Sequence, residues 1–209
     1  MSSFRYFVIY KPFGMLSQFT KEGEHETLAV LFDFPKDVYP VGRLDSDSEG
    51  LLILSNDKKL NHALLDPTNQ HQRTYYVQVE GTITTVDCDK LEKGVGISVD
   101  GKIYSTKPCK VKIIPAPAGI PDRIPPIRVR KTVPDSWISI TLEEGKNRQV
   151  RKMTAAVGFP TLRLIRFSIE KLDIKGMLPR DVREITRMEA YDQLKIFSSN
   201  FSNFRKGNL

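Results

Sequence analysis

The sequence has few cysteines and no long apolar run. Cys88 and Cys109 are the only cysteines among 209 residues, which excludes a disulfide framework and a zinc site built from paired cysteines. No stretch approaches the length of a membrane-spanning helix, and residues 1–6 lack the features of a signal or transit peptide. We therefore expect a soluble protein of the reducing cytoplasm that has no membrane partner.

Positive charge is concentrated in one segment of the chain. The net charge is +7, and residues 107–166 alone carry 13 Lys and Arg against 4 Asp and Glu, a net charge of +9. A solvated basic face and a polyanionic partner such as RNA are both consistent with this bias. Six prolines between residues 115 and 134 predict a long surface loop within the basic segment.

The segments that resemble strands and helices do not alternate regularly. Alternating or β-branched patterns predict strands at residues 4–10, 38–44, 51–54, 74–80, 137–142 and 162–169. Helical spacing and capping residues predict helices at residues 27–32, 84–91, 147–157 and 186–197, followed by a flexible polar tail at residues 198–209. Because strands outnumber helices, we expect an α+β fold with a mixed, mostly antiparallel sheet and flanking helices.

An acidic loop lies between two of the predicted strands. Residues 41–50 read Val-Gly-Arg-Leu-Asp-Ser-Asp-Ser-Glu-Gly, and a loop mounted on a rigid sheet is a common place for a reactive carboxylate such as Asp45. An isolated Asp-Ser-Asp run would equally well cap a turn. The spacing of Asp45, Asp47 and Glu49 also imitates half of a calcium-binding loop. However, the required twelfth-position Glu is replaced by Asn56, and the flanks read as strands.

Four sequence blocks, in order, resemble the signature of bacterial-type rRNA pseudouridine synthases. They are Tyr10-Lys11-Pro12-Phe13-Gly14, Gly42-Arg43-Leu44-Asp45 with Ser48-Glu49-Gly50-Leu51-Leu52, Arg73-Thr74-Tyr75, and Glu144-Gly145-Lys146-Asn147-Arg148-Gln149-Val150-Arg151-Lys152-Met153. The similarity spans about residues 6–170 and is greatest to the branch acting on a single uridine of large-subunit (23S) rRNA. It implies the pseudouridine synthase fold, a catalytic cleft, and an isomerase that uses neither a metal nor an organic cofactor.

The resemblance also assigns roles to individual residues. Asp45 matches the catalytic aspartate, Tyr75 the active-site tyrosine, and Arg151 the basic residue that pairs with the aspartate. Leu164 matches the apolar floor beneath the base. Strand alternation places Tyr75 and Tyr76 on opposite faces, so only one of them lines the cleft, and the resemblance selects Tyr75. Arg43 is expected to contact the substrate, and the residues expected to bind RNA are Lys11, Arg128, Arg130, Lys131, Arg148 and Lys152.

These residue types also suit the chemistry on general grounds. Exchanging a nitrogen glycosidic bond for a carbon one needs a group that attacks or stabilises the detached sugar or base, and a carboxylate does this covalently. A permanent cation nearby lowers the pKa of that carboxylate and keeps it ionised in a cleft. The uridine must leave its stack, so an aromatic side chain that packs on the extruded base is useful.

The expected organisation is an N-terminal lobe at residues 1–66 that carries the catalytic loop, and a C-terminal lobe at residues 67–197 that carries the basic loop and helix. Because the Lys-Pro-Phe-Gly block begins at Lys11, we expect no small RNA-binding module before the catalytic domain. We expect a monomer that needs no protein partner. A non-catalytic RNA-binding protein of the same fold, or a nucleic-acid binder of unrelated design, is the alternative. The joint presence of Asp45, Tyr75 and Arg151 favours the enzyme.

Overall fold

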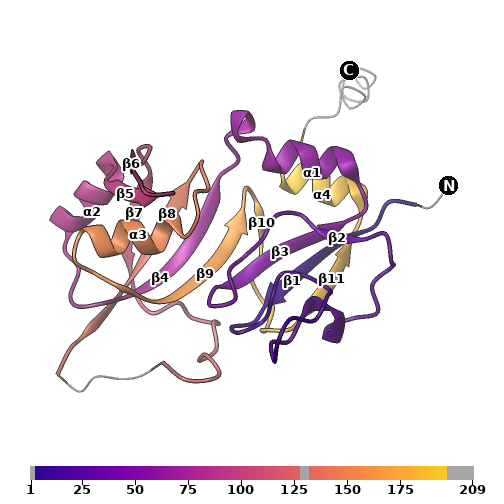
Figure 1. Ribbon diagram of the computed structural model, residues 1–209, viewed down its shortest axis with the longest axis horizontal. Helices are drawn as coiled ribbons and strands as arrows, with labels where there is room; N and C mark the ends of the chain where they lie inside the picture. The colour runs from indigo at the N-terminus through magenta and orange to yellow at the C-terminus, as the bar shows by residue number, and fades with distance from the viewer. Residues whose placement is uncertain (1–2, 128–131, 197–209) are drawn as a thin grey trace, which may run out of the picture.

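The computed structural model describes residues 3–127 and 132–196 and is built around one large sheet (Figure 1). In this part of the chain nine strands form the sheet, with the main order β11-β1-β3-β9-β4-β8-β7, while β2 pairs with β3 and β10 with β9. The strands are β1 (Tyr6–Lys11), β2 (Tyr39–Pro40), β3 (Glu49–Ser55), β4 (Arg73–Glu80), β7 (Lys110–Ile114), β8 (Asp135–Leu142), β9 (Thr161–Ile169), β10 (Leu172–Asp173) and β11 (Val182–Ile185). Only β3 and β9 pair in parallel among these described strands, so the expected mixed, mostly antiparallel α+β sheet is confirmed.

Helices cover the sheet in two groups (Figure 1). The helices are α1 (Lys58–Leu65), α2 (Thr85–Lys93), α3 (Gln149–Ala156) and α4 (Arg187–Gln193), with short 3₁₀ turns at Leu28–Val30 and Pro67–Asn69. The first group, α1 and α4, lies side by side over β1 and β3, whereas α2 and α3 lie at the far end with the hairpin of β5 (Gly96–Val99) and β6 (Lys102–Ser105). None of the helices in residues 3–127 and 132–196 is long and apolar enough to cross a membrane.

The first half of the sheet has an apolar core with one buried carboxylate. Leu60 and Leu64 lie one turn apart on α1 and pack against β1, β3 and α4. Asp57 caps α1 by accepting hydrogen bonds from two backbone amides, and it also accepts the hydroxyls of Tyr6 and Tyr191 at 2.7 and 2.8 Å. Burial alone would raise the pKa of Asp57, but these hydrogen bonds outweigh burial and lower it. The carboxylate therefore ties three elements together without an unpaired buried charge.

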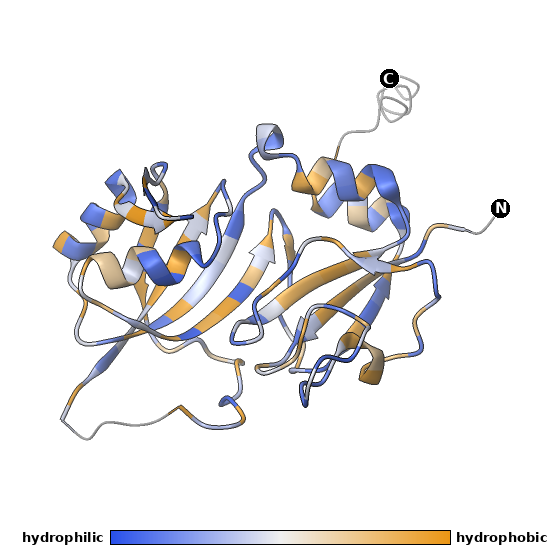
Figure 2. Ribbon diagram, viewed as in Figure 1, coloured by the Kyte–Doolittle hydropathy of each residue, from blue (hydrophilic) through white to orange (hydrophobic). Residues whose placement is uncertain are grey.

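The second half has a separate apolar core beneath α2 and α3. Val150 and Met153 of α3 pack against Val77 of β4 and Ile138 of β8, and all four are buried. In Figure 2 each helix carries both apolar and polar residues, as expected for helices that cover a sheet with one face. The predicted capping box of Thr84 and Asp87 is present and opens α2. The alternate residues of β1 and β3, such as Phe7 and Leu52, pack in a third cluster on the other face of the first half. The two halves therefore have separate apolar cores, and the sheet runs through both.

The division into lobes differs from the expectation at the C-terminal end. We expected residues 67–197 to form one lobe, but β11 pairs with β1 and α4 packs beside α1. The chain after β9 therefore returns to the half that contains residues 6–65. The reason is that β1 would otherwise leave an edge of unpaired backbone groups, which β11 covers. The expected flexible tail at residues 198–209 lies outside the described residues.

Several predicted elements have different bounds in the structure. The predicted strand at residues 38–44 is reduced to the pair Tyr39–Pro40, because Gly42 takes a left-handed backbone with φ +76° and ends the extended run. The predicted helix at residues 27–32 is only the 3₁₀ turn Leu28–Val30. The other predicted strands and helices are present with shifted ends, whereas α1 and the strands β5, β6, β7, β10 and β11 were not predicted.

The two halves join where β3 runs beside β9. Glu49 and Gly50 pair with Ile165 and Arg166 of β9. Gly50 has φ +104°, and a Cβ atom at this position would overlap the Arg166 backbone carbonyl. Only glycine therefore allows the end of the acidic loop to approach β9 this closely.

Candidate active site

The acidic loop opens onto a cavity of about 510 Å³ between the two halves of the sheet. Its walls come from the loop at residues 41–48, from β4, from β9, and from the loop that precedes α3. Six lining residues with functional side chains are Arg43, Asp45, Tyr75, Arg148, Leu164 and Arg166. The sequence-predicted residues Asp45, Tyr75, Leu164, Arg43 and Arg148 therefore meet in one place, and Arg166 joins them.

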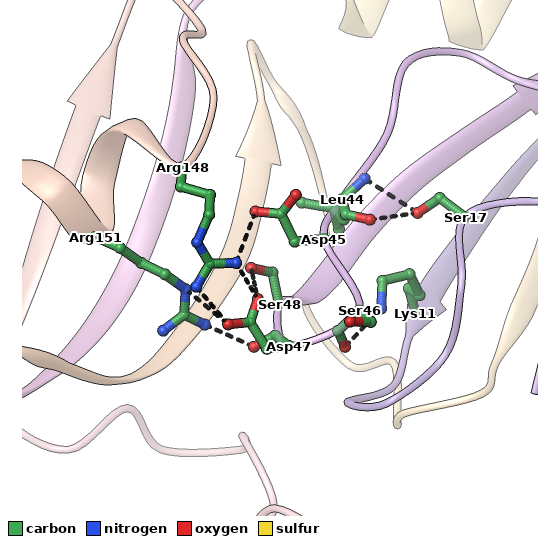
Figure 3. Close-up of polar contacts among 9 residues, drawn as sticks. All are labelled: Lys11, Ser17, Leu44, Asp45, Ser46, Asp47, Ser48, Arg148 and Arg151. Atoms are coloured by element: carbon green, nitrogen blue, oxygen red, sulfur yellow. Dashed lines mark hydrogen bonds and ion pairs between the residues drawn. The ribbon is translucent and has the colours of Figure 1, made fainter. Parts of the chain in front are cut away.

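The backbone around Asp45 is held by a serine from another segment. Ser17 donates its hydroxyl to the Leu44 carbonyl at 2.7 Å and accepts the Leu44 amide at 3.0 Å (Figure 3). The Ser48 amide donates to the Asp45 carbonyl at 3.0 Å and closes the turn. The Asp45 carboxylate itself is 42% exposed and faces the cavity. It is thus fixed at its backbone and open at its side chain, as a nucleophile needs to be.

Lys11 lies beneath this loop and does not reach the surface. Its side chain is fully buried, and its Nζ atom donates to the carbonyls of Met15, Pro12 and Ser46 at 2.7, 3.0 and 3.4 Å. Burial lowers the pKa of Lys11 to about 8, against the opposing attraction of nearby carboxylates. The prediction that Lys11 contacts RNA is therefore wrong for this structure. The lysine instead joins the Lys-Pro-Phe-Gly turn to the acidic loop.

Two arginines of the second half reach across the cavity to the acidic loop. Arg148 contacts Asp47 at 2.7 Å and Asp45 at 3.5 Å (Figure 3). Arg151, 14% exposed, donates to the Asp47 carbonyl at 2.6 Å and lies 3.4 Å from the Asp47 carboxylate. Arg148 is the N-cap of α3 with φ +51°, a conformation that costs a non-glycine residue roughly 1–2 kcal/mol and that begins the helix beside the loop.

The structure does not show the expected direct pair of Arg151 and Asp45. Arg148 and Arg151 instead both contact Asp47. Among the described contacts Arg151 holds Asp47, and Arg148 is the cation that touches Asp45. The physical reason is that the Asp47 carboxylate lies between the two guanidinium groups, 2.7 Å from Arg148 and 3.4 Å from Arg151. Partial burial would raise the pKa of Asp47, but Arg148 and Arg151 outweigh burial and hold it below its usual range. Asp47 is thus an ionised anchor that sequence analysis did not single out.

The two neighbouring tyrosines of β4 point to opposite faces of the sheet. Tyr75 lines the cavity and packs against the core of the second half. Tyr76 packs against the core of the first half and stacks on Phe167, with ring centroids 4.4 Å apart. The structure therefore places the tyrosine selected from the sequence, and not its neighbour, at the cavity.

The remaining predicted residues are more dispersed. Leu164 is buried in the cavity wall, and Arg43 lines the cavity while it donates to Gln18 at 3.3 Å. Lys152 lies on α3, but it is not among the described residues that line the cavity. The predicted RNA-binding residues Arg128, Arg130 and Lys131 lie outside the described residues.

A buried ion pair beside the cavity was also missed. Arg163 donates to both oxygens of Glu49 at 2.7 and 2.8 Å, and both side chains are almost completely buried. A charged residue within an otherwise apolar strand, as in Leu162–Arg163–Leu164–Ile165, was the available signal. Among the described residues no group of three or more His, Cys, Asp or Glu side chains is arranged to hold a metal ion.

Comparison with known proteins identifies relatives of this chain. The model of the RNA pseudouridylate synthase family matches residues 5–156. The ribosomal large subunit pseudouridine synthase E of Xanthomonas axonopodis pv. citri is 48% identical over 175 residues, covering 82% of this chain and 89% of that protein. The protein of the same name from Vibrio parahaemolyticus is 46% identical over 178 residues, covering 85% of this chain and 72% of that protein.

A solved structure supports the same conclusion about the fold. The crystal structure of a pseudouridylate synthase matches with a TM-score of 0.73 at 24% identity, covering 93% of this chain and 75% of that one. At this identity the likeness concerns the fold alone. The resemblance found in the sequence motifs is confirmed by the family model and the curated relatives. The chain belongs to the RNA pseudouridylate synthase family, in the branch of the relatives named ribosomal large subunit pseudouridine synthase E.

Proposed function

We propose that this enzyme isomerises one specific uridine of large-subunit rRNA to pseudouridine, with Asp45 as the nucleophile and without a metal or organic cofactor. The observation that carries the proposal is the Asp45 carboxylate, open to a cavity that also contains an aromatic ring, an apolar floor and a guanidinium group. The choice of large-subunit rRNA is supported by the names of the relatives at 46% and 48% identity.

The cavity residues have different roles in the reaction. The uridine leaves its stack, and its base packs between the ring of Tyr75 and the side chain of Leu164. The N1–C1′ bond then breaks while Asp45 attacks or stabilises the detached sugar or base. The base turns, C5 bonds to C1′, and any bond between Asp45 and C1′ breaks. The hydrogen on C5 leaves as a proton and N1 takes up a proton from solvent, so the product has the composition of uridine and is an isomer.

The two arginines keep the acidic loop in place during this sequence. Arg148 contacts both carboxylates of the loop, and Arg151 holds the Asp47 backbone and side chain. Their permanent charges favour the ionised form of a carboxylate that closure of RNA over the cavity would desolvate. Arg148 is also exposed enough to contact an RNA phosphate, whereas Arg151 is not.

RNA binding outside the cavity is assigned to the basic segment. Arg128, Arg130 and Lys131 in the proline-rich segment and Lys152 on α3 supply charges that would contact rRNA phosphates. Replacing Arg128, Arg130 and Lys131 together by Ala should make the logarithmic salt slope of rRNA binding shallower by roughly two to three units. An unchanged slope would assign phosphate binding to Arg148 and Lys152 instead.

The enzyme is proposed to act as a monomer that needs no protein partner. Both cysteines are free, which is consistent with a reducing cytoplasm where rRNA is found. Light scattering of the protein with and without rRNA tests the monomer.

The Asp45→Asn variant tests the proposed function. It removes the nucleophile and one charge but almost no volume, so folding and rRNA binding should persist while tritium release from C5-labelled uridine is lost. A non-catalytic RNA-binding protein of the same fold would bind the RNA without releasing tritium in either form. Tritium release by the variant at a substantial fraction of the wild-type rate would contradict the role of Asp45.

A further inference from the structure

Arg166 and Tyr75 are direct neighbours across the β4–β9 ladder. Their Cα atoms are register partners in this antiparallel pair, which places the two side chains on the same face of the sheet. Both residues line the cavity that contains Asp45. The strand register therefore brings a tyrosine hydroxyl and a guanidinium group together at the wall where the base is expected to lie.

Arg166 is a buried cation with an incomplete set of hydrogen bonds. The residue is 6% exposed, and its Nε atom donates to the Leu51 carbonyl at 2.8 Å. Its Nη2 atom is buried and has no hydrogen-bond partner among the described residues. A buried donor without a partner is costly, and more so when it carries charge. Such a group calls for a negative partner that is absent from the resting site.

Two other arginines that line the cavity are already engaged. The two terminal nitrogens of Arg73 donate to the carbonyls of His71 and Leu64 at 3.1 and 2.9 Å. Arg148 is paired with Asp47. Burial lowers the pKa of Arg166, and interaction with the Tyr75 hydroxyl opposes that shift. Among the described residues that line the cavity, Arg166 is the one with a buried donor that lacks a partner, and it is the register partner of Tyr75.

We propose that Arg166 is a positioning residue that acts through Tyr75, because its guanidinium group holds the Tyr75 oxygen in place to accept the proton that leaves C5. This inference rests on the function proposed above. After C5 has bonded to C1′, the C5–H bond breaks and its electron pair returns to the ring. The proton forms an O–H bond on Tyr75 while the hydroxyl proton of Tyr75 passes to water. Arg166 touches neither base nor sugar in this step.

The isotope effect at C5 tests this role. Single-turnover rates are measured with substrate RNA that carries hydrogen or deuterium at C5 of the target uridine. We expect Arg166→Gln to slow the reaction roughly 10²-fold, the scale of lost acid–base assistance, and to raise the ratio of the two rates above that of the wild type. The ratio rises because C5–H cleavage becomes rate-limiting. A merely structural defect would slow earlier steps and leave the ratio at or below the wild-type value.

Three variants serve as controls. Arg166→Lys keeps the charge and should return both rate and isotope ratio toward the wild type. Arg73→Gln removes a neighbouring guanidinium that has its own partners, so the isotope ratio should not change. In a Tyr75→Phe background, Arg166→Gln should cause little further loss, because the oxygen through which it acts is gone.

The outcomes separate this inference from the proposed function. An inactive wild type would overturn the function itself. An active wild type with an unchanged isotope ratio in Arg166→Gln, equal effects of Arg73→Gln, or no recovery with Arg166→Lys would overturn the role of Arg166. If Arg166→Gln does not fold, Arg166→Met supplies an apolar chain of similar length and should raise the ratio equally. If neither folds, Tyr75→Phe decides, since a normal isotope ratio in that variant excludes any action through its hydroxyl.

Discussion

The two walls of the cavity are held in place by different physical means. The loop wall, residues 41–48, is irregular backbone fixed by side chains, with Ser17 and Lys11 on one side and Arg148 and Arg151 on the other. The strand wall, formed by Tyr75, Leu164 and Arg166, is fixed by the register of β4 and β9. The position of Asp45, the proposed nucleophile, thus depends on ion pairs between distant segments, whereas the wall proposed to receive the base depends on the sheet. Charge changes should therefore disturb the first wall much more than the second.

Breaking the buried ion pair between Glu49 and Arg163, where the two walls meet, should have the largest effect on stability. Glu49→Gln leaves Arg163 as an unpaired buried charge, so the free energy of unfolding should fall by roughly 3–5 kcal/mol, as measured by urea denaturation. The double variant Glu49→Leu with Arg163→Met removes both charges and should be much closer to the wild type. A single variant as stable as the wild type would show that the pair does not hold the walls together.

The buried lysine under the loop wall should give a pH-dependent stability. Burial lowers the pKa of Lys11 from 10.5 to about 8, so between these pH values the unfolded chain binds more protons than the folded one. Stability of the wild type relative to Lys11→Met should therefore rise as pH increases through this window, by about 3 kcal/mol in total. Urea denaturation of both proteins at a series of pH values measures the difference. A constant or falling difference would contradict the buried position of the ammonium group.

Asp47 tests how the loop wall is held in place, because it contacts both Arg148 and Arg151. Asp47→Asn should lower the single-turnover rate roughly 10²-fold, the scale expected when catalytic groups are slightly misplaced. Affinity for rRNA should not fall, because the substitution adds one unit of net positive charge. Glu26→Gln is the control, since it breaks an exposed ion pair with Arg180 away from the cavity. Equal rates for Asp47→Asn and the control would show that the anchor is dispensable.

The smallest effect on stability and turnover is expected for Tyr76, which lies on the face of β4 opposite the cavity. Tyr76→Phe keeps the ring that stacks on Phe167 and should change stability by no more than about 0.5 kcal/mol, with normal turnover. Tyr75→Phe on the opposite face should keep RNA affinity while turnover falls to a low but measurable rate. Tritium release and rRNA binding by the two variants give the comparison. A larger loss of turnover in Tyr76→Phe would reverse the assigned faces.

The sequence predicted which residues meet at the cavity better than it predicted their contacts. The motif around Asp45 and the alternation at Tyr75 identified residues that the structure does bring together. The position of Arg151 on a helix predicted its direction but not its partner, because a guanidinium group binds whichever carboxylate lies in reach. Lys11 was expected to bind RNA, but the three carbonyls that surround it come together only on folding, which a local pattern does not encode.

Pairing between strands that are distant in the sequence limited how much of the fold could be predicted. The helix α1 was missed although Asp57 as a cap and the spacing of Leu60 and Leu64 were visible in the sequence. The strands β7 and β11 are short, and β11 becomes a strand only because β1 offers it an edge. No pattern within residues 182–185 indicates a partner at residues 6–9, so the lobe boundary could not be placed correctly.

The return of β11 to β1 also affects the order in which the protein folds during synthesis. β1 and the acidic loop leave the ribosome early, but the strand that covers the edge of β1 begins only at Val182. At typical elongation rates this delay is roughly 10 to 30 s. The second half, whose strands β4 to β9 are contiguous in the chain, can complete its own core during that time. The half that carries Asp45 is therefore begun first and finished last, and its nascent edge is exposed to wrong partners throughout elongation.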